Sequence, residues 1–182
     1  MSETSPPITL RDGRVVTIRP LAASDKQALL DFGHSLPEDD WRYLQNDLRA
    51  SETVTWLVNA SDGERWRQVV AASDDGTIAA YSSARLMPGW SSHVADLQLL
   101  VGQRWRNVGV GRSLARGLVD AARAMGAGKL QVSMIQEQRY GFEIFGRMGF
   151  AQEGTLLNHT RDRDGQRHHL VVMALHVEPR VE

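Results

Sequence analysis

The sequence predicts a single α+β domain in which helices flank a mixed, mostly antiparallel β-sheet. Tight-turn groups such as Asp12-Gly13 and Asp164-Gly165 separate alternating apolar runs, a pattern typical of antiparallel hairpins. Helical spacing gathers in separate segments and does not alternate regularly with the strands. A chain of 182 residues is long enough for one such domain and little more.

The first half of the chain is expected to hold a small hairpin, three helices and a larger hairpin. We interpret residues 1–7 as a disordered lead-in and residues 8–182 as the domain. Ser24 and Gln27 have the spacing of a capping box for the first helix. The remaining elements of this half are predicted at residues 8–10 and 15–19 (hairpin strands), 38–48 and 52–60 (helices), and 66–72 and 77–86 (strands).

The second half begins with a strand at residues 94–101, and alternation sets its two faces. Leu97, Leu99 and Val101 share one face, while Asp96 and Gln98 share the other. We expect the histidines at the surface or at sheet edges, namely His159, His168, His169 and His176. The remaining elements are predicted at residues 109–125 and 140–148 (helices) and at 129–135, 150–160 and 167–176 (strands).

Composition excludes several classes of protein. The net charge of −1 gives no support for bulk binding to nucleic acid or to an anionic membrane. The chain has no cysteine, which rules out disulfides and thiolate metal sites and fits a reducing cytoplasm. No apolar stretch is long enough to span a bilayer. We therefore expect a cytoplasmic protein with no metal, no nucleic-acid partner and no membrane partner.

The most informative motif is the glycine-containing turn at residues 103–114, which follows the strand and opens the long helix. The unpaired N–H groups and the dipole of such a helix start form a site for a phosphate or diphosphate. No Gly-Lys-Ser/Thr follows, so the turn is not a P-loop. Position 114 is Leu, which removes the third glycine of a dinucleotide-binding turn.

The pattern Arg106-x-x-Gly109-x-Gly111 resembles the Gln/Arg-x-x-Gly-x-Gly/Ala motif of the GNAT superfamily of N-acetyltransferases. The preceding strand, the following helix and Gly149-Phe150 downstream strengthen this resemblance. The order of elements from about residue 14 to 177 also resembles the GNAT fold. The resemblance implies that the strands before and after the long helix splay apart to admit acetyl-CoA, which serves as co-substrate.

The same resemblance implies a set of cofactor-binding residues. The amides of residues 107–112 would hold the diphosphate, with charge from Arg106 and Arg112, and a backbone N–H near residues 99–101 would bind the thioester oxygen. The expected cofactor-binding residues are Leu99, Leu100, Val101, Arg106, Asn107, Val108, Gly109, Val110, Gly111, Arg112, Ser113, Gln138 and Phe145.

The catalytic candidates are Asp96 and Gln98. Asp96 matches the place of a Glu that acts as base in many relatives, and its shorter side chain would need a bridging water. Gln98 on the same face would orient a water or the substrate. The chain departs from the family at Phe145, where a proton-donating Tyr is common. Tyr140 is predicted to lie on a different side of the short helix, and so to be a poor substitute for that Tyr.

The leading hypothesis is an acetyl-CoA-dependent N-acetyltransferase in which a primary amine attacks the thioester directly. The acceptor is left open between a small amine and a protein lysine or N-terminus. GNAT relatives are often dimers, so a homodimer is also an expectation. A non-catalytic acyl-CoA-binding regulatory domain is the alternative, motivated by Phe145. An unrelated α+β phosphate binder is the third hypothesis.

Overall fold

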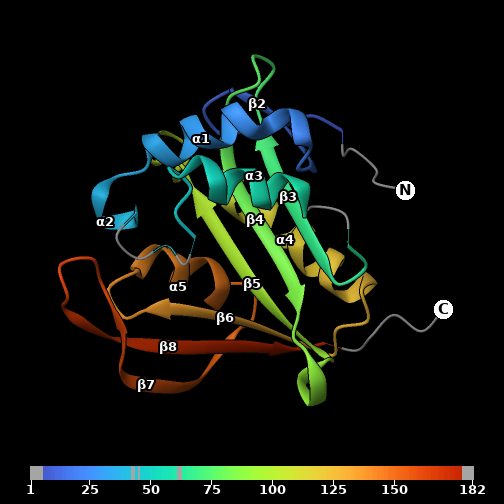
Figure 1. Cartoon of the computed structure of the whole chain (residues 1–182). Helices are drawn as coiled ribbons and strands as arrows, with labels where there is room; N and C mark the ends of the chain where they lie inside the picture. Colours follow the sequence, from blue (N-terminus) through green and yellow to red (C-terminus); the bar gives the residue numbers. More distant parts are fainter. Residues whose placement is uncertain (1–5, 42–43, 45, 61–62, 178–182) are drawn as a thin grey trace.

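The computed structural model describes residues 6–41, 44, 46–60 and 63–177, which form one eight-stranded sheet with helices on both faces (Figure 1). The strand order is β1-β2-β3-β4-β5-β6-β8-β7, and only the β5–β6 pair is parallel. The predicted fold class, an α+β domain with a mixed and mostly antiparallel sheet, is therefore confirmed. Parts of the expected lead-in and of the C-terminal end, residues 1–5 and 178–182, lie outside the described residues. The strands are β1 (Ile8–Thr9), β2 (Val15–Pro20), β3 (Trp66–Ala72), β4 (Ile78–Leu86), β5 (Val94–Val101), β6 (Lys129–Ile135), β7 (Ala151–Arg161) and β8 (Arg167–His176). The helices are α1 (Lys26–Ser35), α2 (Glu38–Trp41), α3 (Ser51–Asn59), α4 (Val110–Ala124) and α5 (Arg139–Gly146).

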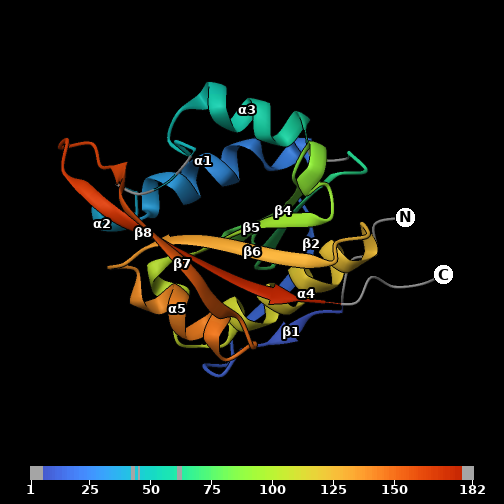
Figure 2. The same ribbon diagram turned by 90° about the horizontal axis from the view of Figure 1, so that it is seen from below.

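Helices α1 and α3 cover one face of the sheet, and α4 and α5 cover the other (Figure 2). Each face has its own apolar core, with Leu29 and Leu57 among the fully buried side chains on the α1–α3 side and Leu118 and Leu130 on the α4–α5 side. The longest helix of the described chain, α4, has 15 residues, and no helix described is both long and apolar enough to cross a bilayer.

The parallel pair β5–β6 is interrupted halfway along. Its register runs from Val94 opposite Lys129 to Leu97 opposite Val132 and then stops, although both strands continue. β4 stays paired with β5 as far as Val101, so the gap opens between β5 and β6 alone. The two strands run apart in Figure 1. This is the separation of central strands that the family resemblance implied.

The helix predicted at residues 38–48 is wrong beyond Trp41, where α2 ends. Residues 44 and 46–48 are not helical, and residues 42, 43 and 45 lie outside the described chain. The carboxylate of Asp47 accepts hydrogen bonds from Trp41 Nε1 at 3.1 Å and from the N–H of Arg49 at 3.0 Å. Such local side-chain bonds compete with the helical ladder and end it early.

The capping box predicted at Ser24 and Gln27 is also wrong. Instead, Asp25 is the third residue of a 3-10 turn (Ala23–Asp25) before α1, and its carboxylate accepts the N–H of Ala22 at 2.8 Å. Both oxygens of Asp25 also bind the guanidinium of Arg19, at 2.6 and 2.7 Å, which ties the start of α1 to β2.

Candidate active site

The start of α4 presents free backbone donors. Gly109 caps this helix with φ at +104° and has no side chain to accept a hydrogen bond. The first bond of the helix runs from Ser113 N–H to Gly109 O at 3.1 Å, so the N–H groups of residues 110–112 have no acceptor within the helix. Asn107, just before, is one of two described non-glycine residues with positive φ, at +62°. The start of α4 therefore offers unpaired amides at the place where the sequence predicts an anion site.

The two glycines of the motif serve different ends. A Cβ on Gly109 would meet nothing within 4 Å, so the left-handed backbone explains this glycine. A Cβ on Gly111 would lie 3.0 Å from Ile144, 3.1 Å from Val101 and 3.4 Å from the hydroxyl of Tyr140. Gly111 thus allows α4 to pack tightly on β5 and α5, a reason that the sequence motif does not reveal.

The turn between β1 and β2 holds the loop before α4 in place. The N–H of Arg11 donates to Val108 O at 3.1 Å, and Arg14 Nη2 donates to Arg104 O at 2.7 Å. The guanidinium of Arg14 also lies 3.9 Å from the ring centroid of Trp105. This support of the glycine loop by the N-terminal hairpin was not predicted.

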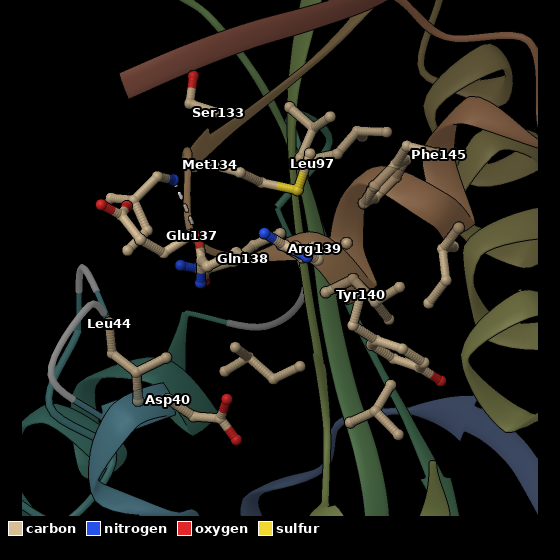
Figure 3. A pocket seen from close by; sticks show the side chains of 18 of the residues that line it. Asp40, Leu44, Leu97, Ser133, Met134, Glu137, Gln138, Arg139, Tyr140 and Phe145 are labelled. Atoms are coloured by element: carbon tan, nitrogen blue, oxygen red, sulfur yellow. Dashed lines mark hydrogen bonds between the residues drawn. The ribbon is translucent and has the colours of Figure 1, made fainter. Parts of the chain in front are cut away.

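A cavity of about 540 Å³ lies where β5 and β6 separate (Figure 3). Its walls come from β5 and β6 from their last paired residues onward, from α5, from α2 and the segments on either side of it, from the end of β7 and from Leu170 on β8. The volume is in the range of small-molecule sites. The predicted site residues that line it are Gln98, Leu99, Leu100, Val101, Arg106, Gln138 and Phe145. Asn107, Val108, Gly109, Val110, Gly111, Arg112 and Ser113 are not in its lining, but Gly111 packs against three side chains that are.

The backbone of Leu99 faces this cavity. At the two ends of β5, Val94 O accepts the N–H of Met87, and the N–H of Gly102 donates to Ala79 O. Because backbone groups alternate between the two edges of a strand, the N–H and C=O groups of the even-numbered residues of β5 face β4. The amides of Leu99 and Val101 therefore point to the opposite edge, where pairing with β6 has already ended. An N–H donor that is aimed into a crevice is the geometry required to bind an oxygen that gains negative charge.

Arg106 is held inside the cavity. Its Nε donates to Val101 O at 3.3 Å, and its Nη2 pairs with the carboxylate of Asp40 on α2. Its guanidinium also lies 5.8 Å from the ring centroid of Tyr140. The first arginine of the motif thus links α2 to the end of β5. Sequence reasoning did not identify Asp40 as its partner.

The structure separates the two catalytic candidates. Gln98 lines the cavity, whereas Asp96 does not. Asp96 lies opposite Gln131 in the half where β5 and β6 are still paired, and opposite Arg85 on β4. Burial raises the pKa of Asp96 to about 6, and the charge of Arg85 acts in the opposite direction.

The short helix α5 contributes aromatic and amide groups to the cavity. Phe145 is 2% exposed and packs edge-to-face on Phe150 with centroids 5.1 Å apart. The side chain of Gln138 accepts the N–H of Ile135 at 3.0 Å, which fixes the turn into α5 (Figure 3). Tyr140 lines the same cavity as Phe145, and its hydroxyl reaches toward the start of α4 (Figure 3).

His168, expected at the surface or at a sheet edge, is not at the surface. It is 7% exposed, since its ring lies between the carboxylates of Glu137 and Asp162. Glu137 and Arg161 line the cavity and were not predicted as site residues. The available signal was weak, because Glu137 only precedes Gln138 and Arg161 only follows the strand predicted at residues 150–160.

Together, a helix start with unpaired amides and an adjoining crevice give this α+β domain the geometry of a ligand-binding protein. The sequence model of the Acetyltransferase (GNAT) family matches residues 30–150, and the chain belongs to this family. It is thus an acetyltransferase of the acetyl-CoA-dependent kind, as the motif had indicated.

Known proteins agree with this assignment. The L-amino acid N-acetyltransferase AaaT of Escherichia coli is 23% identical over 141 residues, covering 77% of this chain and 85% of the relative. The yncA protein of Salmonella typhimurium, solved with its cofactor acetyl-CoA, has a TM-score of 0.77 at 16% identity and covers 92% of this chain and 96% of its own. The ribosomal-protein-S5-alanine acetyltransferase of Vibrio fischeri has a TM-score of 0.80 at 11% identity and covers 96% of both chains. The two structures share the fold along nearly the whole chain.

Proposed function

We propose that this chain transfers the acetyl group of acetyl-CoA to the primary amine of a small acceptor by direct attack. The amine nitrogen forms a bond to the thioester carbonyl carbon, the C–S bond breaks, and the coenzyme leaves as a thiolate that takes a proton. The observation that carries the proposal is the separation of β5 from β6, which opens a cavity next to the free amides of α4. Holding both reactants in one crevice is the main source of rate in such a reaction.

Acetyl-CoA would extend from the start of α4, where its diphosphate would bind, into the crevice between β5 and β6, where its thioester would lie. The diphosphate would accept hydrogen bonds from the loop and helix start, with Arg112 adding positive charge. The thioester would reach between β5 and β6, where the amide of Leu99 would bind its oxygen as charge develops. Phe145 would pack against the sulfur end, and Gln98 would orient the acceptor or a water. The remaining groups proposed at the diphosphate are Asn107, Val108, Gly109, Val110, Gly111 and Ser113.

We further propose that the acceptor is a small amine that also bears a carboxylate group. Arg139 and Arg161 both line the cavity, and within the described chain neither forms an ion pair. The pantetheine arm of the coenzyme is uncharged and gives these guanidinium groups no partner. A carboxylate is the ligand that their planar donors suit best. The relative AaaT bears the name of an enzyme that acts on L-amino acids, which supports the same class.

The test follows thiol release when the purified protein is mixed with acetyl-CoA and separate amines. The panel holds L-amino acids, the matching amino-acid amides, polyamines and a peptide with a free N-terminus and a lysine. We expect release with an L-amino acid, detection of its acetylated product by mass spectrometry, and much slower release with the matching amide. Release with the peptide alone would move the acceptor to proteins. Tight binding of acetyl-CoA with no amine-dependent release would favour the regulatory alternative.

A further inference from the structure

Glu137 stands at the acceptor side of the cavity, between the end of β6 and the start of α5. In Figure 3 it lies across the cavity from Asp40 and Leu44, which come from the region of α2. Thr160 and Arg161 at the end of β7 also line the cavity. The Glu137 side chain is 58% exposed, so an entering molecule can reach it.

A buried histidine holds this carboxylate. His168 Nδ1 lies 3.3 Å from Glu137 Oε1, and His168 Nε2 lies 3.0 Å from Asp162 Oδ2. The Asp162 side chain is fully buried, and its Oδ1 accepts the N–H of Gln166 at 2.8 Å. The hydrogen bond to Asp162 raises the pKa of His168, and Glu137 adds to this effect. A protonated ring donates from both nitrogens, one to each carboxylate.

The two carboxylates on His168 differ in exposure. The Asp162 side chain is fully buried, so the carboxylate oxygens that an entering molecule can reach belong to Glu137. Asp40, the other carboxylate of the lining, forms an ion pair with Arg106, which neutralises it. Asp96 is not in the lining at all. Of the described carboxylates, Glu137 is therefore the one that an acceptor amine in the cavity can use.

We infer that Glu137 is a catalytic residue that accepts a hydrogen bond from the acceptor amine and then takes its proton. This inference rests on the proposed function. The bound neutral amine attacks, and its nitrogen becomes strongly acidic as the C–N bond forms. Glu137 takes one proton from this nitrogen, directly or through a water, the C–S bond breaks, and Glu137 passes the proton to solvent. His168, fixed by Asp162, is a positioning residue.

The first test is Glu137→Gln, which removes the charge and keeps the size of the side chain. We expect kcat/KM for the amine to fall about tenfold to a hundredfold, with little change in the affinity for acetyl-CoA. Glu143→Gln is the matched control. Glu143 lies on α5, which begins two residues after Glu137, and its side chain is 66% exposed and does not line the cavity. We expect the control to match the wild-type chain.

A double-mutant cycle tests the role of His168. His168→Gln is expected to lower kcat/KM severalfold in the wild-type background and to have almost no further effect in Glu137→Gln. A merely structural role would give the same loss in both backgrounds, together with a lower melting temperature. That pattern would remove His168 from the inference.

Three outcomes separate the two proposals. If the wild-type chain acetylates an amine and Glu137→Gln matches it, the inference on Glu137 is wrong and the proposed function stands. If Glu137→Gln loses activity while its melting temperature and acetyl-CoA affinity are kept, both stand. If the wild-type chain binds acetyl-CoA and acetylates no amine of the panel, the proposed function fails and the inference falls with it.

Discussion

The two halves of the β5–β6 pair differ in what the backbone does. In residues 94–97 of β5, both edges of the strand are hydrogen-bonded, and the side chains of Ala95 and Leu97 pack in the core. In residues 98–101 the edge toward β6 is free, and the same strand lines a cavity. One strand therefore supplies stability where it is paired and a binding surface where it is not. A site built this way needs no irregular backbone, because the free donors remain held by β4.

Proline substitutions give the largest expected contrast between the halves. Leu99→Pro removes the amide that faces the cavity and spares the ladder to β4, so we expect kcat to fall about a hundredfold to a thousandfold in a folded protein. Leu97→Pro removes an amide that faces β6 together with a buried side chain, and we expect it not to fold. Thermal melts and thiol release measure both effects.

Leu99→Ala is the control, because it shortens the side chain and keeps the N–H. We expect it to retain far more activity than Leu99→Pro. If Leu99→Pro unfolds as Leu97→Pro does, the free edge of β5 contributes to stability after all, and the contrast between the halves is lost.

A reversal of charge tests whether the cavity and the start of α4 form one site. Arg112→Glu places a carboxylate where the diphosphate should bind, and we expect the Kd for acetyl-CoA to rise at least about tenfold. The helix should persist, since negative charge is favourable in its first turn. Arg116→Glu makes the same exposed charge change one turn further on and should have a small effect. Equal effects on Kd, measured by calorimetry, would point to general electrostatics and not to a site.

Much of the fold could be predicted, because turns and alternation are local signals. The sequence does not distinguish the two halves of β5, because alternation places Asp96 and Gln98 on the same face of the strand. They differ in the structure because pairing with β6 ends at Leu97, so Gln98 lines the cavity and Asp96 does not. Asp162 and His168 lie in one hairpin, but Glu137 follows β6 and reaches His168 only because β8 pairs with β6. Such meetings depend on tertiary pairing, and a single sequence does not encode them as a pattern.

Asp96→Asn tests whether residues 94–97 of β5, the half paired with β6, contribute to stability and not to catalysis. Burial raises the pKa of Asp96 to about 6. The folded state then binds more protons than the unfolded state between about pH 4 and pH 6, so stability falls as pH rises through this window. We expect Asp96→Asn to raise the free energy of unfolding by about 1–2 kcal/mol at pH 7 and to change it little below about pH 4.

Chemical denaturation across this pH range measures the effect. We expect kcat/KM of Asp96→Asn for the amine to stay within about twofold of the wild-type value. A loss of tenfold or more, with the variant folded, would make Asp96 the base as the family resemblance first suggested. It would also extend the functional part of β5 into its paired half.

The smallest effect is expected from Phe145→Tyr. This change adds a hydroxyl group to the lining of the cavity, at the position where the family resemblance implies a Tyr. A thiol ionises near about pH 8.5, so a coenzyme thiolate leaves with little need of a proton donor, and we expect kcat to change by less than about threefold. Phe142→Tyr is the matched control, since Phe142 lies on α5 and does not line the cavity. Rapid-mixing assays of thiol release across pH compare the two. A rise of tenfold in Phe145→Tyr alone would mean that protonation of the thiolate limits the rate of this chain, and that Phe145 leaves the cavity without the required donor.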